Sequence, residues 1–310
     1  MPRIVVVGSA NVDYALALAR LPRPGETVSG GSLLVNLGGK GANQATAAAR
    51  GGGEVALIGC VGDDAAGREV RRSLADEGVD VSGLMLTAEA ATGAALILVG
   101  ADGQNMIGVA PGANHRLRVE AMAVHAPAIR TADVVLCQLE TPLAVVRWVL
   151  AEARTHGVTT VLDPAPVQPL DDELLGLVNY LTPNAGEAGA LAGLEVSDLA
   201  SARAAARRLC ARGVSTAVVT LGGAGCLAAR EEAAVHFPAF PVDAVDTTAA
   251  GDAFSGVLAV GLAAGGTLEQ AIPLASAAAA LTCMRRGAQD ALPRRPEVER
   301  FLASRRQGAG

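Results

Sequence analysis

The sequence predicts an α/β fold, in which a mostly parallel sheet is covered by helices, and three observations predict it. Apolar runs of strand length recur between helix-length segments rich in Ala, the pattern of a parallel sheet with crossover helices. The chain has 310 residues and is 51% hydrophobic, which is enough for a sizeable core. It has only one Trp, two Tyr and four Phe, so Ala, Val and Leu must fill that core, which favours helices packed closely on a sheet.

The predicted strands and helices alternate along the chain. We expect strands at residues 4–7, 55–58, 134–136, 160–162, 180–181 and 217–220. We expect helices at residues 42–50, 65–77, 143–156, 199–212, 253–264 and 268–284. Most of these helices begin after Gly, Pro, Asp or Thr and end near Gly, the usual signals of helix ends. The tail from Arg294 onward is polar, and we expect it to fray.

Two stretches interrupt this alternation, residues 14–37 and residues 92–110. Both contain turn signals and strand-like residues but little helical periodicity. The segment Ala101-Asp102-Gly103 lies between two apolar runs and predicts a hairpin turn. We therefore expect both stretches to form a small sheet that projects from the main body as a lid. Because no long linker or repeat divides the chain, we expect one domain over residues 1–310.

Composition argues against several classes of protein. The net charge is −6 and no basic cluster with interleaved aromatics is present, which argues against a nucleic-acid partner. The most apolar stretches are shorter than the roughly 20 residues that span a bilayer, and no signal peptide is recognisable, so we expect a cytoplasmic protein without membrane contact. Five scattered Cys residues without a Cys-x-x-Cys pair predict neither a zinc site nor a disulfide framework.

The strongest local signal is LGGKGANQATAAARGG at residues 37–52, where a Gly-rich turn opens an Ala-rich helix. Such a turn exposes backbone N–H groups and the positive end of the helix dipole, which suits an anion or a cluster of hydroxyls. The segment is not a Walker A loop, because Leu34 and Gly41 stand where Gly and Ser or Thr are required. Lys40 is the only Lys in the chain. The alternatives are a tight turn that merely caps a helix and a Lys that survives by chance.

The second signal is VDTTAAGDAFSG at residues 245–256, with Asp246, a run of small residues and Asp252 at the opening of a helix. Small residues let backbone amides approach a phosphate closely, and a carboxylate there can accept a proton from an attacking hydroxyl. The alternative is that Asp252 only stabilises the helix dipole and Asp246 is an ordinary turn residue.

Further polar residues lie near the predicted strand ends and are individually more typical of caps and solvated turns. In a parallel sheet the carboxyl ends of the strands meet at one edge, so these residues can line one cleft. They are Asn11, Asp13, Asn43, Glu140, Asp163, Asn184 and Glu187. The four His residues have neither metal spacing nor a neighbouring nucleophile motif.

Eleven motifs in order resemble the ribokinase branch of the PfkB family of carbohydrate kinases, over residues 4 to about 293. They are GSANVD, RPGET, GGKGANQA, IGCVGDD, PGAN, LETP, DPAP, TPN with Glu187, TLGGAG, DTTAAGD and RRGAQ. The resemblance implies a Rossmann-like sheet with helices on both faces and a small β-sheet lid that often forms a homodimer contact. It also implies an ATP-dependent kinase that phosphorylates the 5-hydroxyl of D-ribose.

The resemblance also implies roles for individual residues. Asp252 is the expected base, and the backbone amides of Ala249, Ala250, Gly251 and Asp252 are the expected anion hole. The expected sugar-binding residues are Asn11, Asp13, Gly39, Lys40, Asn43, Glu140 and Asp252. The expected nucleotide-binding residues are Asn184, Thr220, Leu221, Gly222, Gly223, Ala224, Gly225, Gly251 and Ser276.

Two metal ions are implied by the same resemblance. Mg²⁺ is expected between the phosphates and waters that Asn184 and Glu187 position. K⁺ is expected beside the anion hole, mostly on backbone carbonyls of Asp246, Thr248, Thr282, Arg285 and Gly287. The chain departs from the family at Ala291, where a Ser is common, which puts one K⁺ ligand in doubt. It also departs at Ser276, where Asn or His often approaches the adenine.

Other functions remain open at this point. Another sugar or a nucleoside can be the acceptor in the same fold, although the scarcity of aromatics offers little to stack a nucleobase. A sugar sensor without catalysis is expected to lack the base, yet Asp252 is present. A dinucleotide-dependent oxidoreductase needs a glycine fingerprint that the sequence does not contain.

Overall fold

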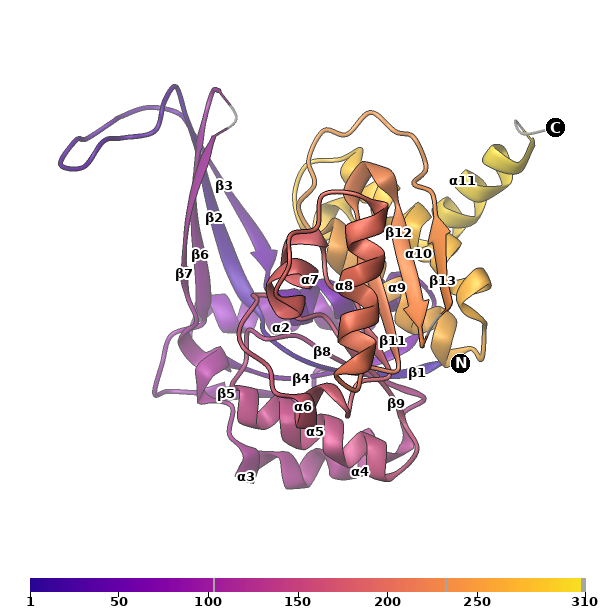
Figure 1. Ribbon diagram of the computed structural model, residues 1–310. Helices are drawn as coiled ribbons and strands as arrows, with labels where there is room; N and C mark the ends of the chain where they lie inside the picture. The colour runs from indigo at the N-terminus through magenta and orange to yellow at the C-terminus, as the bar shows by residue number, and fades with distance from the viewer. Residues whose placement is uncertain (103, 232, 308–310) are drawn as a thin grey trace.

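The computed structural model describes residues 1–102, 104–231 and 233–307, and its main body is built on a nine-stranded sheet (Figure 1). The strand order is β13-β12-β11-β10-β9-β8-β1-β4-β5. The strands from β11 to β5 pair in parallel, whereas β12 and β13 are antiparallel. Their bounds are β1 Arg3–Val7, β4 Glu54–Gly62, β5 Leu84–Thr87, β8 Val134–Cys137, β9 Thr159–Leu162, β10 Tyr180–Leu181, β11 Thr216–Thr220, β12 Cys226–Arg230 and β13 Ala233–Phe237.

Helices cover both faces of this sheet, because successive side chains of a strand point to opposite faces. In β1, Val5 and Val7 belong to one buried cluster, and Ile4 and Val6 to another. The first face carries α3 Val119–Met122, α4 Ala126–Thr131, α5 Leu143–Thr155, α6 Asp172–Leu175, α7 Ala185–Ala192 and α8 Leu199–Ala211. The second carries α1 Lys40–Arg50, α2 Ala65–Asp76, α9 Ala250–Ala263, α10 Leu268–Cys283 and α11 Arg295–Gln307. None of the described helices is long and apolar enough to cross a membrane.

The predicted α/β fold is confirmed, and each predicted strand and helix is present with ends shifted by a few residues. One shift matters for the site: α9 begins at Ala250, three positions before the predicted start, so Asp252 lies in its first turn. The antiparallel β12 and β13 were not predicted. Each is only five residues long, which is too short to distinguish from an irregular loop.

The prediction that the tail from Arg294 frays is wrong, because residues Arg295–Gln307 form α11. The helix is mostly polar, but Val298 is buried and Phe301 packs edge-to-face on Phe240 with ring centroids 5.5 Å apart. Glu297 also pairs with Arg285 at 2.5 Å. A few apolar side chains at helical spacing are therefore enough to dock this tail.

A separate four-stranded sheet rises from the main body, as expected from the two irregular stretches (Figure 1). Its order is β3-β2-β6-β7, with bounds β2 Asn11–Leu18, β3 Ser32–Gly38, β6 Gly93–Gly100 and β7 Asn105–Ala110. β2 follows directly after β1, so one end of the small sheet lies at the carboxyl edge of the large one. β6 and β7 pair antiparallel, while Gly103 of the predicted turn lies outside the described residues.

Candidate active site

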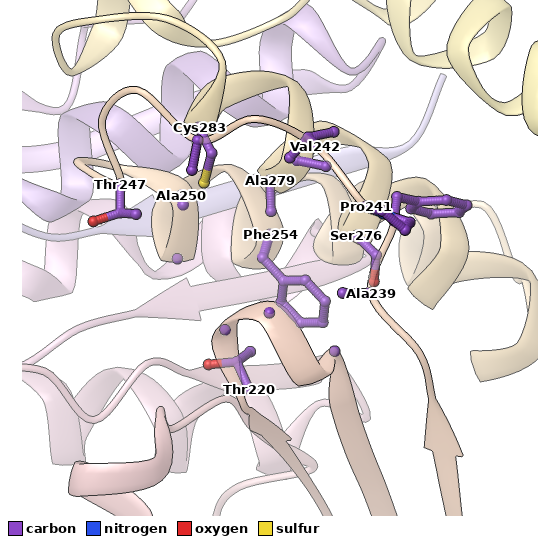
Figure 2. Close-up of a pocket in the computed structure, with 17 residues that line it drawn as sticks. Thr220, Ala239, Pro241, Val242, Thr247, Ala250, Phe254, Ser276, Ala279 and Cys283 are labelled. Carbon is purple, nitrogen blue, oxygen red and sulfur yellow. The ribbon is translucent and has the colours of Figure 1, made fainter.

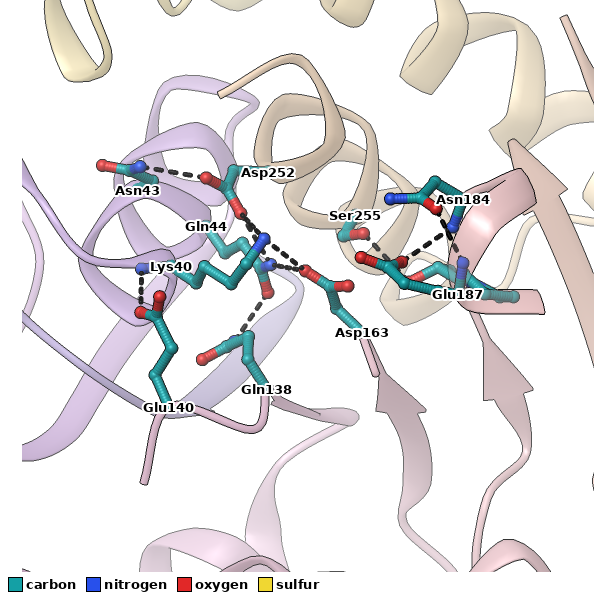
Figure 3. Close-up of polar contacts among 12 residues, drawn as sticks. Lys40, Asn43, Gln44, Gln138, Glu140, Asp163, Asn184, Glu187, Asp252 and Ser255 are labelled. Atoms are coloured by element: carbon teal, nitrogen blue, oxygen red, sulfur yellow. Dashed lines mark hydrogen bonds and ion pairs between the residues drawn. The ribbon is translucent and has the colours of Figure 1, made fainter. Parts of the chain in front are cut away.

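The predicted site residues lie at the carboxyl edge of the large sheet, where the strands end and two helices begin. Glu140 follows β8, Asp163 follows β9 and Asn184 follows β10. The N-termini of α1 and α9 enter the same region, with Lys40 opening α1 and Asp252 in the first turn of α9 (Figure 3). This is the edge at which open α/β sheets bind ligands.

The start of α1 is fixed by close backbone contacts that only glycine permits. Gly39 has φ 87°, and an added Cβ would stand 2.8 Å from Cα of Ala10. A Cβ at Gly41 would stand 2.6 Å from the carbonyl carbon of Gly8. The Lys40 N–H then donates to Oε2 of Glu140 at 3.0 Å. The Gly-rich segment therefore brings the strand that carries Asn11 against the helix that carries Lys40.

The start of α9 leaves backbone donors facing open space. Ala249 precedes the helix in the left-handed conformation with φ 59°, a costly geometry for a residue with a side chain. The N–H groups in the first turn of a helix have no acceptor within the helix. A Cβ at Gly251 would meet no atom from outside its own helix turn within 4 Å, and Gly251 lines an open cavity. The N–H of Ala250 donates to the Thr247 carbonyl at 3.3 Å, so the amides of Ala249, Gly251 and Asp252 are the members of the predicted anion hole that are available to an anion.

Asp252 is only 5% exposed and is held by side chains from α1. Asn43 Nδ2 donates to its Oδ2 at 2.9 Å, and Gln44 Nε2 donates to its Oδ1 at 2.9 Å. The Lys40 ammonium lies 3.8 Å from the same Oδ1 and 3.5 Å from Oδ2 of Asp163 (Figure 3). Of the predicted sugar-binding residues, Lys40, Asn43 and Asp252 thus share one buried polar cluster.

Two amides of this cluster were missed in the sequence. Gln44 follows Asn43 in the Gly-rich motif, and Gln138 precedes Glu140 in the QLE segment after β8. Gln138 Nε2 donates to Oε1 of Gln44 at 2.6 Å, and both side chains are fully buried. A polar amide inside or just after an otherwise apolar segment is the signal that could have identified them.

The sugar-binding candidates on the small sheet come from β2. Asn11 Oδ1 accepts from Asn114 Nδ2 at 2.7 Å, and Asn114 Oδ1 accepts from the N–H of Ala10 at 2.9 Å. Asn114 lies in the PGAN motif and had no predicted role, although its buried amide fixes the orientation of Asn11. Asp13 stands two residues further along β2, on the same face as Asn11.

The cluster shifts the pKa of three groups in a consistent direction. Burial, together with the charges of Glu140 and Asp252, raises the pKa of Asp13 to about 6. Burial raises the pKa of Asp163 to about 7, against the lowering effect of Lys40. For Lys40, burial alone lowers the pKa, but the surrounding carboxylates outweigh it and raise the pKa well above its usual value. The ammonium therefore stays charged at any physiological pH.

A cavity of about 430 Å³ lies on the other side of the α9 N-terminus (Figure 2). Six of the predicted nucleotide-binding residues line it, namely Thr220, Gly222, Gly223, Gly225, Gly251 and Ser276. Asn184 is adjacent, because its backbone bridges to Thr220, whereas Leu221 and Ala224 are not part of the lining. Gly225 is required there, since its φ is 93° and a Cβ would stand 2.0 Å from the Phe237 carbonyl oxygen.

The apolar wall of this cavity was not predicted. It comes from the loop after β13, with Phe240, Pro241 and Val242, and from α9 and α10, with Phe254 and Ala279. Its side chains are flat or small and carry few polar atoms, which suits the face of a planar ring. A loop without polar or Gly-rich signals gave no reason to place it at a site, so only its apolar residues could have marked it.

Asn184 and Glu187 begin α7 as a reciprocal capping box. Asn184 Oδ1 accepts from the Glu187 N–H at 2.9 Å, and Glu187 Oε2 accepts from the Asn184 N–H at 2.8 Å. Asn184 is exposed and Glu187 is half-buried beside the cluster (Figure 3). Within the described residues, no group of three or more His, Cys, Asp or Glu could hold a metal by itself. The oxygens present therefore fit a Mg²⁺ ion that keeps waters and takes ligands from phosphates.

The predicted K⁺ residues lie on two loops that contact each other. Asp246 Oδ2 accepts from the Gly287 N–H at 3.0 Å, and Asp246 Oδ1 accepts from the Thr248 N–H at 2.9 Å. The N–H of Asp246 donates to the Cys283 carbonyl at 3.1 Å, which joins the loop before α9 to the end of α10. The two loops that carry the predicted K⁺ residues therefore lie against each other.

The chain is similar to known carbohydrate kinases. The family described as pfkB family carbohydrate kinase matches residues 1–295. The ribokinase of Haemophilus influenzae is 40% identical over 299 residues, which cover 96% of this chain and 98% of that protein. The deoxyribokinase of Salmonella typhi is 33% identical over 301 residues, which cover 97% and 98%. Arabidopsis thaliana ribokinase, solved in complex with ribose and ATP, has a TM-score of 0.92 and 32% identity, covering 97% of this chain and 98% of that one.

Proposed function

The chain belongs to the pfkB family of carbohydrate kinases, which transfer phosphate to a sugar hydroxyl, and we propose that it transfers the γ-phosphate of ATP to the 5-hydroxyl of D-ribose. One observation carries the proposal. The start of α9 separates the apolar cavity, which its residues Ala250 and Gly251 line, from the polar cluster that contains Asp252. A nucleotide in the cavity and a sugar in the cluster would meet at this helix end.

In the proposed reaction the sugar hydroxyl oxygen attacks the γ-phosphorus, and Asp252 accepts the hydroxyl proton. The new P–O bond forms as the bond to the leaving ADP oxygen breaks, so charge develops on the phosphoryl oxygens. The N–H groups of Ala249, Gly251 and Asp252 are placed to stabilise that charge. The N–H of Ala250 donates to the Thr247 carbonyl at 3.3 Å and would have to give up that contact to join them. Catalysis then depends mainly on position and on charge neutralisation.

The sugar-binding set supports a small polyol as acceptor. Asn11, Asp13, Asn43 and Glu140 supply amide and carboxylate groups, and Lys40 supplies an ammonium, all suited to hydroxyls. Glu140 is fixed by the N–H of Lys40 and by the hydroxyl of Ser9, so its free oxygen has a defined direction.

Metal ions complete the proposal. Mg²⁺, bound by the nucleotide phosphates and by waters that Asn184 and Glu187 orient, would supply charge neutralisation. K⁺ held by the loops of Asp246 and Gly287 would stabilise the backbone just before the anion hole. We further propose that the small sheet acts as a lid over the sugar, that it joins two copies of the chain, and that the enzyme works in the cytoplasm.

A second acceptor is 2-deoxyribose, because a deoxyribokinase is 33% identical over nearly the whole chain. The two sugars differ by one hydroxyl, and a site that hydrogen-bonds this group discriminates strongly against its absence. The test measures ADP release with D-ribose, 2-deoxyribose, fructose and adenosine at equal concentrations, with Mg²⁺ present and the Asp252→Asn variant as a blank. We expect the highest kcat/KM with D-ribose. Comparable or faster turnover of a nucleoside or of 2-deoxyribose would reject ribose as the substrate.

A further inference from the structure

Asp163 is a buried carboxylate to which the mechanism above gives no task. It follows β9 directly, and its N–H donates to the carbonyl of Cys137 at 2.9 Å, which fixes its backbone in the sheet. The residue is only 5% exposed. Burying an ionisable side chain in this way is costly unless partners compensate, so its contacts indicate what it does.

Asp163 shares both of its side-chain partners with Asp252. Gln44 Nε2 donates to Oδ2 of Asp163 at 2.7 Å and to Oδ1 of Asp252 at 2.9 Å. The Lys40 ammonium lies 3.5 Å and 3.8 Å from the same two oxygens. One amide therefore donates to both carboxylates, and one ammonium pairs with both, as Figure 3 shows.

The bridging amide cannot turn around without a penalty. Gln138 Nε2 donates to Oε1 of Gln44 at 2.6 Å, so the Gln44 oxygen faces Gln138 and its NH₂ group faces the two carboxylates. Reversing the amide would leave oxygen against oxygen at both Asp163 and Asp252. The two carboxylates are thus held in a defined relation before any substrate binds.

We propose that Asp163 is a positioning residue of the transfer reaction. Its carboxylate partly offsets the positive charge of Lys40 that faces Asp252, and this makes Asp252 a stronger base. The inference rests on the role proposed above for Asp252. Lys40 stabilises the carboxylate form of each Asp that it faces, whereas a second carboxylate nearby favours the protonated form of the first. A base with higher proton affinity accepts the hydroxyl proton more readily.

The surroundings of Asp163 make this effect depend on pH. The charged and polar groups that face it are Lys40 and Gln44 from α1, Asp252 from α9 and Glu187 from α7. Burial, with the charges of Asp252 and Glu187, raises the pKa of Asp163 to about 7. Near neutrality, Asp163 is therefore part protonated. When it is protonated it no longer offsets the Lys40 charge, which then acts fully on Asp252. Turnover is expected to fall to a lower plateau as Asp163 takes up its proton.

The first test compares the pH dependence of kcat in the wild type and in Asp163→Asn, which keeps the size of the side chain but not its charge. We expect the wild type to lose about three- to ten-fold in kcat between roughly pH 8 and pH 6. The variant should be flat over that interval, at the low plateau of the wild type. A variant that retains the wild-type inflection would overturn the proposal. Asp133→Asn, at an exposed site near β8, is the matched control and should keep the wild-type profile.

A second readout needs no turnover. In ligand-free protein with ¹³C-labelled Asp carboxyls, NMR titration should show a carboxyl that is lost in Asp163→Asn and titrates near neutrality in the wild type. Asp252, identified with Asp252→Asn, should release its proton at a lower pH in Asp163→Asn than in the wild type. An unchanged Asp252 titration in Asp163→Asn would reject the proposed electrostatic coupling between the two carboxylates, whatever the activity. If the coupling is found but the wild type phosphorylates no sugar, the proposed function fails and the electrostatic relation stands.

Discussion

The ammonium of Lys40 lies 3.8 Å from Oδ1 of Asp252, although the two residues open helices that are far apart in the chain. The contact joins the Gly-rich signal near the N-terminus to the DTTAAGD signal near the C-terminus. It also gives a structural reason for the single Lys of the sequence, because the compact ammonium lies within 4 Å of two buried carboxylates while its side chain remains 30% exposed.

Replacing Lys40 with Arg should therefore damage the site while keeping its charge. The planar guanidinium is wider and donates in fixed directions, so it would displace Asp163 or Asp252 from their shared contacts with Gln44. We expect the KM for ribose to rise about ten-fold, with a smaller fall in kcat. Steady-state kinetics measure both. Unchanged KM and kcat in Lys40→Arg would mean that the lone Lys is an accident of composition.

Asp252→Asn should separate catalysis from binding. The amide keeps the size of the carboxyl and can still contact Asn43 or Gln44, but it cannot accept the proton of the attacking hydroxyl. We expect kcat to fall by about 10²- to 10⁴-fold, while calorimetry finds ribose affinity within a few-fold of the wild type. Near-normal turnover in a folded variant would remove Asp252 from its role as base.

Much of this site could be predicted because its backbone parts leave local signals. Gly39 must adopt positive φ and Gly41 must let two backbones touch, so both stand out in the sequence as glycines before a helix. The side-chain partners of Asp252, in contrast, leave no local signal in the sequence. Whether Gln44 and Gln138 point toward the cluster depends on how α1 lies against the end of β8, which no local pattern encodes.

The same limit explains the missed apolar wall of the cavity and the missed α11. Phe240 lies in a loop and Phe301 in a polar helix, and neither residue is distinctive in the sequence. Their mutual packing decides that both segments are ordered against α10. Long-range contacts of this kind override local propensity. The polar composition of the tail, taken alone, therefore predicted fraying.

Asp13 predicts how stability depends on pH. Its pKa is raised to about 6 in the folded protein, mainly by burial, from 3.8 as an isolated group. Between these values the folded state holds a proton that the unfolded state has lost, so the free energy of unfolding decreases as pH rises through about 4 to 6. Asp163 contributes with the same sign up to about pH 7. Both effects weaken the free protein at the pH at which it would bind sugar.

Denaturant unfolding of Asp13→Asn tests this sign. Relative to the wild type, the variant should gain about 1 kcal/mol at pH 8 and little or nothing at pH 4, a modest value because Asp13 is partly solvated. Asp80→Asn, at an exposed residue beside β4, is the control and should change neither value. A gain that is larger at pH 4 than at pH 8 would contradict the assignment.

The small sheet predicts association of two copies. Pairing in register puts Tyr14 beside Val35 and Leu96, so these side chains share a face, opposite to the face of Asp13. On that face Val35 is 53% exposed and Leu96 is 62% exposed. Closure over the sugar could cover the Asp13 face, but only another molecule can cover this one.

We therefore expect the wild type to sediment as a dimer and the Leu96→Glu, Val35→Glu double variant to sediment as a monomer. A charge buried in an apolar contact between copies carries a desolvation penalty that an exposed surface does not impose. Val124→Glu, at a residue that is 76% exposed on the helical side, is the matched control and should remain dimeric. A monomeric wild type at micromolar concentration would end the proposal.

The loops of Asp246 and Gly287 predict activation by K⁺. Their contact at 3.0 Å holds together the segment that leads directly into Ala249 and the anion hole, so a cation there would restrain the amides that face the phosphate. At constant ionic strength and Mg²⁺, kcat should be about ten-fold higher in K⁺ than in Na⁺, since a ring of carbonyls sized for the larger ion coordinates the smaller one poorly. Ala291 is buried beside these loops and offers no hydroxyl, so Ala291→Ser should reach half-activation at a lower K⁺ concentration. Equal rates in the two salts for both proteins would leave the kinase intact and remove the cation from it.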